Sequence, residues 1–277
     1  MDSATPARLH VLLARDAPHA VVIRRGPSKH TAVIGWNRET DTFSLGQWLR
    51  GRIYERRCDL SPDGEHFLYF AMNGKWASSV KGSWTAISRA PYLKAITLFA
   101  KGDCWNGGGL FRYNHSYRLN EGLYAHALQW QDASLRRVDD ADWQRQPGEC
   151  PGIYYERLAR DGWIAGVAYG DGSGGGVLPF DKPISDRWLL RKYAHAGPAR
   201  HAGRGCYFDT HALVDRREGT TIAKDAWEWA DVDRGRLVWA ANGILGTTRI
   251  DTEGEPGADT LLHDFNAMKF ERLVAPY

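Results

Sequence analysis

The chain has little cysteine, no strong excess of charge of either sign and no long hydrophobic run. Its 277 residues carry 36 basic and 33 acidic side chains, which gives a net charge of +3. This even balance argues against a polyanionic partner, so nucleic acid is not expected. No segment reaches the roughly 18 apolar residues of a membrane-spanning helix, and the first 25 residues hold no signal-peptide core. We therefore expect a cytoplasmic protein without a membrane partner.

Several catalytic and metal-binding motifs are also missing. The four cysteines, Cys58, Cys104, Cys150 and Cys206, form no Cys-x-x-Cys pair, which removes support for a zinc ribbon or a thioredoxin-like site. The Gly-x-Ser-x-Gly elbow of common serine hydrolases and the Gly-Lys-Ser/Thr ending of a P-loop are absent. We expect free, mostly buried thiols and no cofactor.

The chain contains several apolar runs that are bounded by turn residues. In the run from Cys58 to Ala71, Pro62 presets φ and Gly64 tolerates a positive φ. This pattern predicts two short strands joined by a Pro-Asp-Gly turn. Hairpins of the same form are expected at residues 84–99, 155–169 and 229–240.

A second element recurs along the chain, a turn followed by a strand with a small and a bulky residue. Its markers are Gly35, Gly109, Gly176 and Gly243, which are 74, 67 and 67 residues apart. Such a quasi-period, with hairpins between the markers, predicts antiparallel meanders of three or four strands like the blades of a β-propeller. The sequence thus predicts an all-β fold, a single five-bladed propeller over residues 1–277.

Helical signals are few and short. Residues 185–192 begin with an N-cap serine and carry an apolar stripe, so they predict a short helix, and residues 140–146 suit a solvated helical turn. Residues 261–265 and 269–273 fit helix or strand by periodicity. We predict strands, because pairing of the two chain ends would close the ring and give residues 9–13 a partner.

One stretch supports a family resemblance. Leu60-Ser61-Pro62-Asp63-Gly64 followed by Phe67-Leu68-Tyr69-Phe70 resembles the hairpin of WD40 and TolB-type propeller repeats. The resemblance implies the propeller architecture. It leaves function open, since propellers serve for binding, scaffolding and catalysis alike.

Twelve tryptophans give this chain a heavy aromatic content. Inside strands such residues fill the space between sheets, whereas exposed aromatic rings stack on sugars or contact protein side chains. Trp105 adjoins a glycine-rich turn, and Trp48, Trp76 and Trp130 lie in expected connecting segments. These four residues are candidate binding residues.

Two glycine-rich turns, residues 103–109 and 171–176, place polar side chains on flexible backbone. Asn106 and Asp171 in these turns are candidate binding residues, because carboxylate and backbone groups can hold calcium or an anion. Neither turn has the ligand spacing of an EF-hand. Plain tight turns are the competing interpretation.

Asp209 and His211 are two residues apart in an expected strand, so their side chains should share one face. That geometry suits a metal ion or proton transfer. No third ligand is visible in the sequence, and a hydrogen-bonded structural pair is the competing interpretation.

Together these features favour a non-catalytic binding or scaffolding module that recognises a protein partner through one propeller face. Residues 120–150 and 193–206 are expected to form the contact surface, since loops on stiff scaffolds commonly carry recognition. One alternative is a carbohydrate-binding or glycoside-hydrolysing propeller, whose carboxylates would come from separate blades. The other is a metal-assisted enzyme that uses Asp209 and His211.

Overall fold

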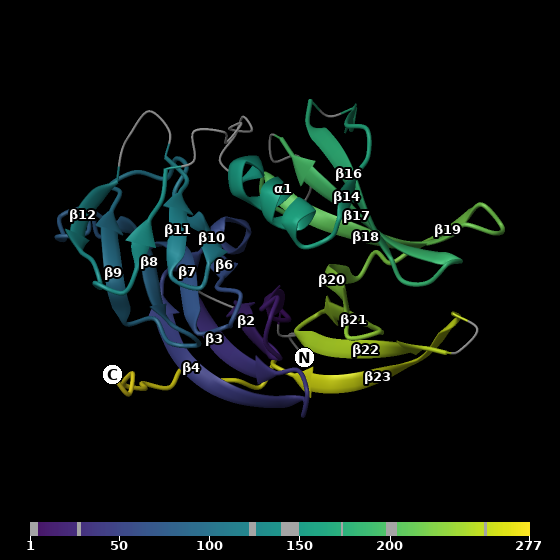
Figure 1. The fold of residues 1–277 in the computed structure, drawn as a ribbon, viewed down its shortest axis with the longest axis horizontal. Helices are drawn as coiled ribbons and strands as arrows, with labels where there is room; N and C mark the ends of the chain where they lie inside the picture. The colour runs from purple at the N-terminus through teal and green to yellow at the C-terminus, as the bar shows by residue number, and fades with distance from the viewer. Residues whose placement is uncertain are drawn as a thin grey trace. The chain divides into compact units, whose positions relative to one another are not determined.

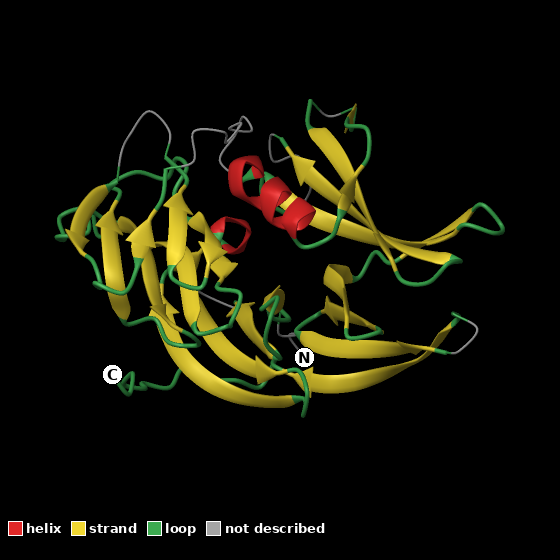
Figure 2. Ribbon diagram, in the orientation of Figure 1, coloured by secondary structure: helices red, strands yellow, loops and turns green. Residues whose placement is uncertain are grey.

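The computed structural model describes residues 5–26, 29–121, 126–139, 150–172, 174–197, 204–251 and 254–277. Strands predominate among them and form five sheets, here called A to E, with three to six strands each (Figure 2). Almost all strand pairs are antiparallel, so the all-β class is confirmed. No helix in these ranges is long and apolar enough to cross a membrane.

The chain folds into two compact units. Unit 1 comprises residues 1–5, 11–157 and 269–277, and unit 2 comprises residues 6–10 and 158–268. Each unit therefore includes a short segment from the far end of the chain. The prediction of a single propeller domain stays a prediction.

Sheets A, B and C belong to unit 1, apart from the first residues of β1 (Figure 1). Sheet A is a meander of β1 (Arg8–Leu13), β2 (His19–Arg25), β3 (His30–Asn37) and β4 (Thr42–Arg50). Sheet B orders β12 (Ala127–Trp130), β9 (Ala95–Ala100), β8 (Ser83–Arg89), β7 (His66–Met72) and β5 (Arg52–Ile53), and β6 (Asp59–Leu60) also pairs with β7. Sheet C contains β10 (Gly109–Tyr113), β11 (Ser116–Leu119) and β13 (Arg136–Arg137), the last pair parallel.

Sheet B lies between two apolar cores, because alternate residues of its strands face opposite sides. Phe67 and Tyr69 of β7 pack in one core with Val21 and Val33 of sheet A. Leu68 packs in the other core, together with sheet C residues. Burial on both faces explains why β7 reads as a continuous apolar run instead of an alternating one. The 3-10 turn Glu55–Arg57 leads into this sheet.

Unit 2 contains sheets D and E. Sheet D orders β14 (Ile164–Ala165), β16 (Gly176–Pro183), β17 (Trp188–Ala196), β18 (Tyr207–Asp215) and β19 (Thr220–Ala223), and β15 (Tyr169–Gly170) also pairs with β16. Sheet E is a meander of β20 (Trp227–Asp233), β21 (Arg236–Ala241), β22 (Ile244–Ile250) and β23 (Pro256–Asp264).

Three of the four expected hairpins are confirmed. The Pro-Asp-Gly turn joins β6 and β7, with Gly64 at φ +77°, and β8 pairs with β9. In the hairpin of β20 and β21, Arg234 and Gly235 both have positive φ. That is the two-residue turn whose twist matches antiparallel strands.

The hairpin expected at residues 155–169 is wrong, because its first half is the helix α1 (Pro151–Arg160). Proline suits a first helical turn. The Asp161-Gly162 turn, expected to join two strands, instead ends the helix. The N–H of Gly162 donates to the carbonyl of Ala159, and the N–H of Trp163 to that of Leu158. With Gly162 at φ +87°, these bonds form a Schellman motif.

The helix predicted at residues 185–192 is wrong as well. Most of this segment belongs to β17, in which Trp188, Leu190 and Lys192 alternate with more exposed residues. Ser185 Oγ accepts a hydrogen bond from the N–H of Trp188 at 3.1 Å. That contact resembles a helix N-cap, but it closes a turn between strands. The helical turn predicted at residues 140–146 lies outside the described residues.

The prediction for the end of the chain is half confirmed. Residues 261–264 lie in β23, whereas residues 269–273 form no strand. Gln47 Nε2 donates to the carbonyl of Leu273 at 2.9 Å, and Tyr277 Oη donates to that of Lys94 at 2.7 Å. Side chains thus bind this tail where a neighbouring strand was expected. The described sheets pair β1 with β2 and β23 with β22, so they do not contain the predicted pairing of chain ends.

Candidate functional site

Two neighbouring loops of unit 1 carry exposed tryptophans. Residues 73–82 connect β7 to β8, and residues 101–108 connect β9 to β10. Both loops lie at the same end of sheet B, because Trp84 at the start of β8 pairs with Ala100 at the end of β9. Trp76 is 54% exposed and Trp105 is 57% exposed. We call residues 73–82 and 101–108 the tryptophan loops.

Hydrogen bonds join Ser83, which directly follows the first tryptophan loop, to the second loop. Ser83 Oγ donates to the carbonyl of Asp103 at 2.6 Å, and the N–H of Lys101 donates to that of Ser83 at 2.9 Å. A Cβ added at Gly102 would lie 3.3 Å from the Lys81 side chain. The two loops are therefore neighbours at this end of sheet B.

The loop that carries Trp105 is held by a buried arginine. Arg57 is 2% exposed, and its Nη1 donates to the carbonyls of Cys104 and Asn106 on either side of the tryptophan. The N–H of Trp105 donates to Asp103 Oδ1 at 2.8 Å. Its main chain is thus fixed while its ring remains in solvent. Asn106 adopts φ +55°, a conformation that Asn tolerates better than most residues, so its main chain shapes this loop.

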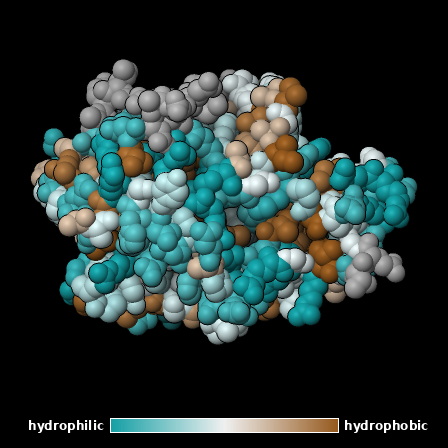
Figure 3. All heavy atoms as spheres, viewed as in Figure 1, coloured by the Kyte–Doolittle hydropathy of each residue, from teal (hydrophilic) through white to brown (hydrophobic). Residues whose placement is uncertain are grey.

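Charge around the tryptophan loops is unevenly distributed. Residues 73–82 contain Lys75 and Lys81, both exposed, and no acidic residue. Asp103 of the other loop is paired with Lys101 at 2.7 Å. Within the two loops, the charge without a partner among the described residues is therefore positive. On the face drawn in Figure 3, hydrophilic residues predominate and hydrophobic residues form small groups among them.

The two other candidate tryptophans lie in strands, not in connecting segments. Trp48 in β4 is half-buried, with the Arg24 guanidinium 5.5 Å from its ring and the Phe270 ring 6.0 Å away. Trp130 in edge strand β12 is 51% exposed, and its Nε1 donates to the carbonyl of Ala95 at 3.4 Å. Ala95 begins β9, so Trp130 is directed away from the tryptophan loops.

The candidates in unit 2 have structural contacts. Asp171 Oδ1 accepts the N–H of Gly175 at 3.0 Å, which closes its glycine-rich turn. Asp209 and His211 are both buried and share a face of β18, as predicted. His211 Nδ1 lies 3.0 Å from the carbonyl of Trp227 and Nε2 lies 2.9 Å from Lys192 Nζ. Both ring nitrogens are therefore engaged, and this arrangement gives the metal hypothesis no support.

Much of the contact surface expected from residues 120–150 and 193–206 lies outside the described residues.

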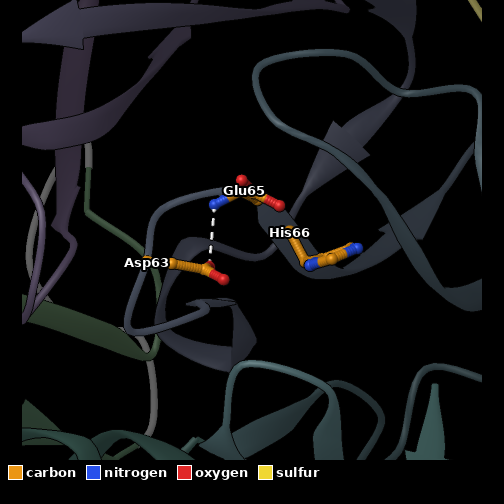
Figure 4. Close-up of side chains that lie close together, drawn as sticks. All are labelled: Asp63, Glu65 and His66. Carbon is orange, nitrogen blue, oxygen red and sulfur yellow. Dashed lines mark hydrogen bonds between the residues drawn. The ribbon is translucent and has the colours of Figure 1, made fainter. Parts of the chain in front are cut away.

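The described residues contain one polar cluster that the sequence analysis did not identify. Asp63, Glu65 and His66 place a carboxylate or ring-nitrogen atom within 4.8 Å of one another in the β6–β7 hairpin (Figure 4). The residues stand in the very run that predicts the hairpin. The sequence analysis used this run to predict a turn and did not consider its two carboxylates and its histidine as metal ligands.

A pocket of about 430 Å³ adjoins this cluster. Its lining includes Pro62, Asn114, His115 and Arg136. Asn114 Oδ1 accepts the N–H of Asp63 at 3.1 Å, and the His115 ring lies 5.5 Å from that of His66. Burial lowers the pKa of His66, an effect that the carboxylate of Asp63 opposes and the neighbouring His115 reinforces.

A larger pocket of about 750 Å³ lies in unit 2 and is lined by Arg187, Arg216 and Arg217 among others. Arg187 is bound by the carboxylates of Asp215 and Glu255. Its charge is therefore already compensated within the protein, and this pocket is a weaker candidate for an anion site.

Comparisons with known proteins give no family. No family model matches the chain, and no curated protein matches it. Among solved structures, a point variant of apocarotenoid oxygenase from Synechocystis aligns over 98% of the chain at 8% identity, with a TM-score of 0.18. The alignment spans 65% of that oxygenase. A likeness this weak carries no argument about function.

Proposed function

We propose that this chain is a non-catalytic binding module that recognises an acidic segment of a protein partner through the tryptophan loops. The observation that carries this proposal is Trp105, a mostly exposed ring on a loop whose flanking carbonyls are bound by buried Arg57. A loop whose main chain is already fixed loses little conformational entropy on binding, and tryptophans are enriched among the residues that dominate interface energies.

The proposed partner is acidic because of the neighbouring lysines. Lys75 and Lys81 flank Trp76 on a loop without acidic residues. Electrostatic complementarity of this kind accelerates association and selects among partners. An extended acidic peptide with one or two apolar side chains would place its carboxylates near the lysines and its apolar groups on the indole rings.

We further propose that the five sheets are the blades of a single five-bladed propeller. Support comes from the meander order of sheets A and E and from the face-to-face packing of sheets A, B and C. Propeller blades are meanders of this kind. A propeller would be a rigid scaffold that holds the tryptophan loops in place for binding.

Selection from a random-peptide phage library tests the binding proposal. The full-length chain should enrich acidic peptides with apolar residues, and their affinity should fall as salt is raised. The double variant Trp76→Ala/Trp105→Ala should weaken binding by about tenfold or more. Trp130→Ala is the matched control, because this exposed tryptophan faces the other end of β9, and it should bind normally.

A glycan array serves as the second arm, because exposed indole rings beside glycine-rich turns also suit sugar stacking. Glycan binding that requires Trp76 and Trp105, with no peptide enriched, would replace the protein partner by the carbohydrate alternative. Peptides that bind the double variant as tightly as the native chain would refute the proposed surface.

A further inference from the structure

We propose that Asp63, Glu65 and His66 form a binding site for one divalent transition-metal ion, for which Zn²⁺ is the best fit. The site is independent of the tryptophan loops. It sits on the β6–β7 hairpin of unit 1, where Asp63 and Glu65 belong to the turn and His66 begins β7. Figure 4 shows the three side chains lying close together, with the hydrogen bond from the main-chain N–H of Glu65 to Asp63 dashed.

The spacing of the three side chains is close to that of bound ligands. Their ligand atoms lie within 4.8 Å of one another, whereas ligand atoms around a four-coordinate zinc ion lie roughly 3.4 Å apart. The largest separation would have to shorten by about 1.4 Å to reach that spacing. Glu65 is exposed, so its side chain is free to make that movement.

The histidine supplies a second and independent indication. His66 is only 6% exposed, and its Nδ1 atom is buried without a hydrogen-bond partner in the described part of the chain. Buried polar atoms in native proteins nearly always have a partner, and an ion is one explanation for those that lack one. A metal ion bound between the carboxylates would use the lone pair of this nitrogen.

The carboxylates have acceptor capacity to spare. Asp63 Oδ1 accepts hydrogen bonds from Ser61 Oγ and from the N–H of Glu65. These bonds fix the carboxylate, and within the described residues they use the same oxygen, so Oδ2 remains for a ligand. Arg89 lies opposite His66 on β8, with its guanidinium 5.0 Å from the ring of Tyr277, and Arg136 lines the adjoining pocket.

The donor set favours a transition metal over calcium or magnesium. Imidazole nitrogen suits zinc, copper, iron and nickel, whereas calcium and magnesium prefer oxygen alone. Three protein ligands leave a fourth position for water, which is how an accessible zinc site differs from a closed one. The adjoining pocket, lined by Asn114 and His115, provides an entry path.

Metal titration of the full-length chain tests the site. The exposed thiols of Cys104 and Cys206 would compete for zinc, so both are first replaced by serine, and the protein is freed of metal with a chelator. Calorimetry should show one Zn²⁺ per chain. Bound Co²⁺ should give a visible spectrum of nitrogen and oxygen ligands without a thiolate charge-transfer band.

Variants in the same background decide whether the binding belongs to this cluster. Glu65→Gln and His66→Gln should each weaken Zn²⁺ binding by roughly tenfold or more, while Glu39→Gln, in an exposed turn elsewhere, should leave it unchanged. If His66→Gln fails to fold, Glu65→Gln decides, since Glu65 is on the surface. The absence of stoichiometric binding, equal affinity in Glu65→Gln, or binding of Ca²⁺ alone would overturn the proposal.

Discussion

Lys192 and His211 meet across neighbouring strands of sheet D, where Lys192 Nζ lies 2.9 Å from His211 Nε2. Lys192 is 1% exposed, donates to the carbonyl of Ala230 at 3.3 Å and lies 4.8 Å from the ring of Trp163. The lysine therefore links β17 and β18 to sheet E inside the core of unit 2. His211, a candidate metal ligand from the sequence, lies in this core with Lys192 beside its Nε2 atom.

This pair should be energetically coupled. We expect Lys192→Met to destabilise the protein by about 1–3 kcal/mol, because His211 loses a buried donor. In a double-mutant cycle with His211→Phe, the second substitution should cost less once the first is present, with a coupling energy of about 0.5–3 kcal/mol. Denaturant unfolding measures all four proteins. Strictly additive losses would show that the two side chains act separately.

Gly64 should tolerate no side chain. Its φ is +77°, and an added Cβ would lie 2.7 Å from that of His19. Gly74 also has a positive φ, +71°, but no atom in the described part of the chain lies within 4 Å of its Cβ position. We expect Gly74→Ala to cost about 1 kcal/mol through backbone strain alone and Gly64→Ala to cost more. Equal losses by chemical denaturation would show that the close approach to His19 relaxes freely.

We expect the folding stability of unit 1 to fall at acid pH as Glu121 becomes protonated. Hydrogen bonds from His126 and Arg137 lower the pKa of Glu121 to about 2, despite its partial burial. A carboxyl group whose pKa is depressed on folding stabilises the protein fully above its unfolded pKa of about 4.3, and this contribution is lost as the pH falls towards 2.

Burial also lowers the pKa of His126, so its neutral form is favoured on folding. Its contribution begins to fall near pH 6.5, in the same direction as that of Glu121. Glu121→Gln should therefore flatten the loss of stability between about pH 4 and pH 2, as followed by thermal unfolding, whereas Glu39→Gln should not. If Glu121→Gln loses stability between pH 4 and pH 2 as steeply as the native chain, the acid sensitivity comes from other groups.

The four thiols should fall into two classes. Cys104 and Cys206 are exposed, while Cys58 and Cys150 are buried, and burial raises the pKa of both buried thiols. A thiol reagent should thus modify two cysteines in the native protein and the other two only after unfolding. Rapid modification of all four without denaturant would contradict this arrangement. The expectation of mostly buried thiols holds for half of them.

Local turn chemistry made the hairpins predictable. Pro62 fixes its own φ, and Gly64 and Gly235 adopt a positive φ that few other residues accept, so their positions indicated β6–β7 and β20–β21 directly. The Asp161-Gly162 turn has the same appearance but caps a helix, because glycine with positive φ serves both purposes. Ser185 likewise accepts a main-chain N–H as an N-cap would, yet the alternation of Trp188, Leu190 and Lys192 makes a strand.

In the candidate sites, too, local features were predictable and long-range contacts were not. Exposure of Trp76, Trp105 and Trp130 was predicted from their local surroundings and agrees with the structure. The role of Arg57 in holding Trp105 was not predictable, because the two residues are far apart in sequence and meet only when β10 packs against sheet B. Among the described residues the buried Nδ1 atom of His66 has no hydrogen-bond partner, and this too depends on tertiary packing.

The sequence by itself determined the all-β class, most of the tight turns and the exposure of several tryptophans. These properties follow from backbone angles and apolar periodicity within about ten residues. Only the tertiary structure decided which strands share a sheet, that His211 bonds Lys192 and that the chain's last residues are bound by side chains such as Gln47. Each of those outcomes depends on long-range packing and on polar groups finding partners distant in sequence, which no local pattern encodes.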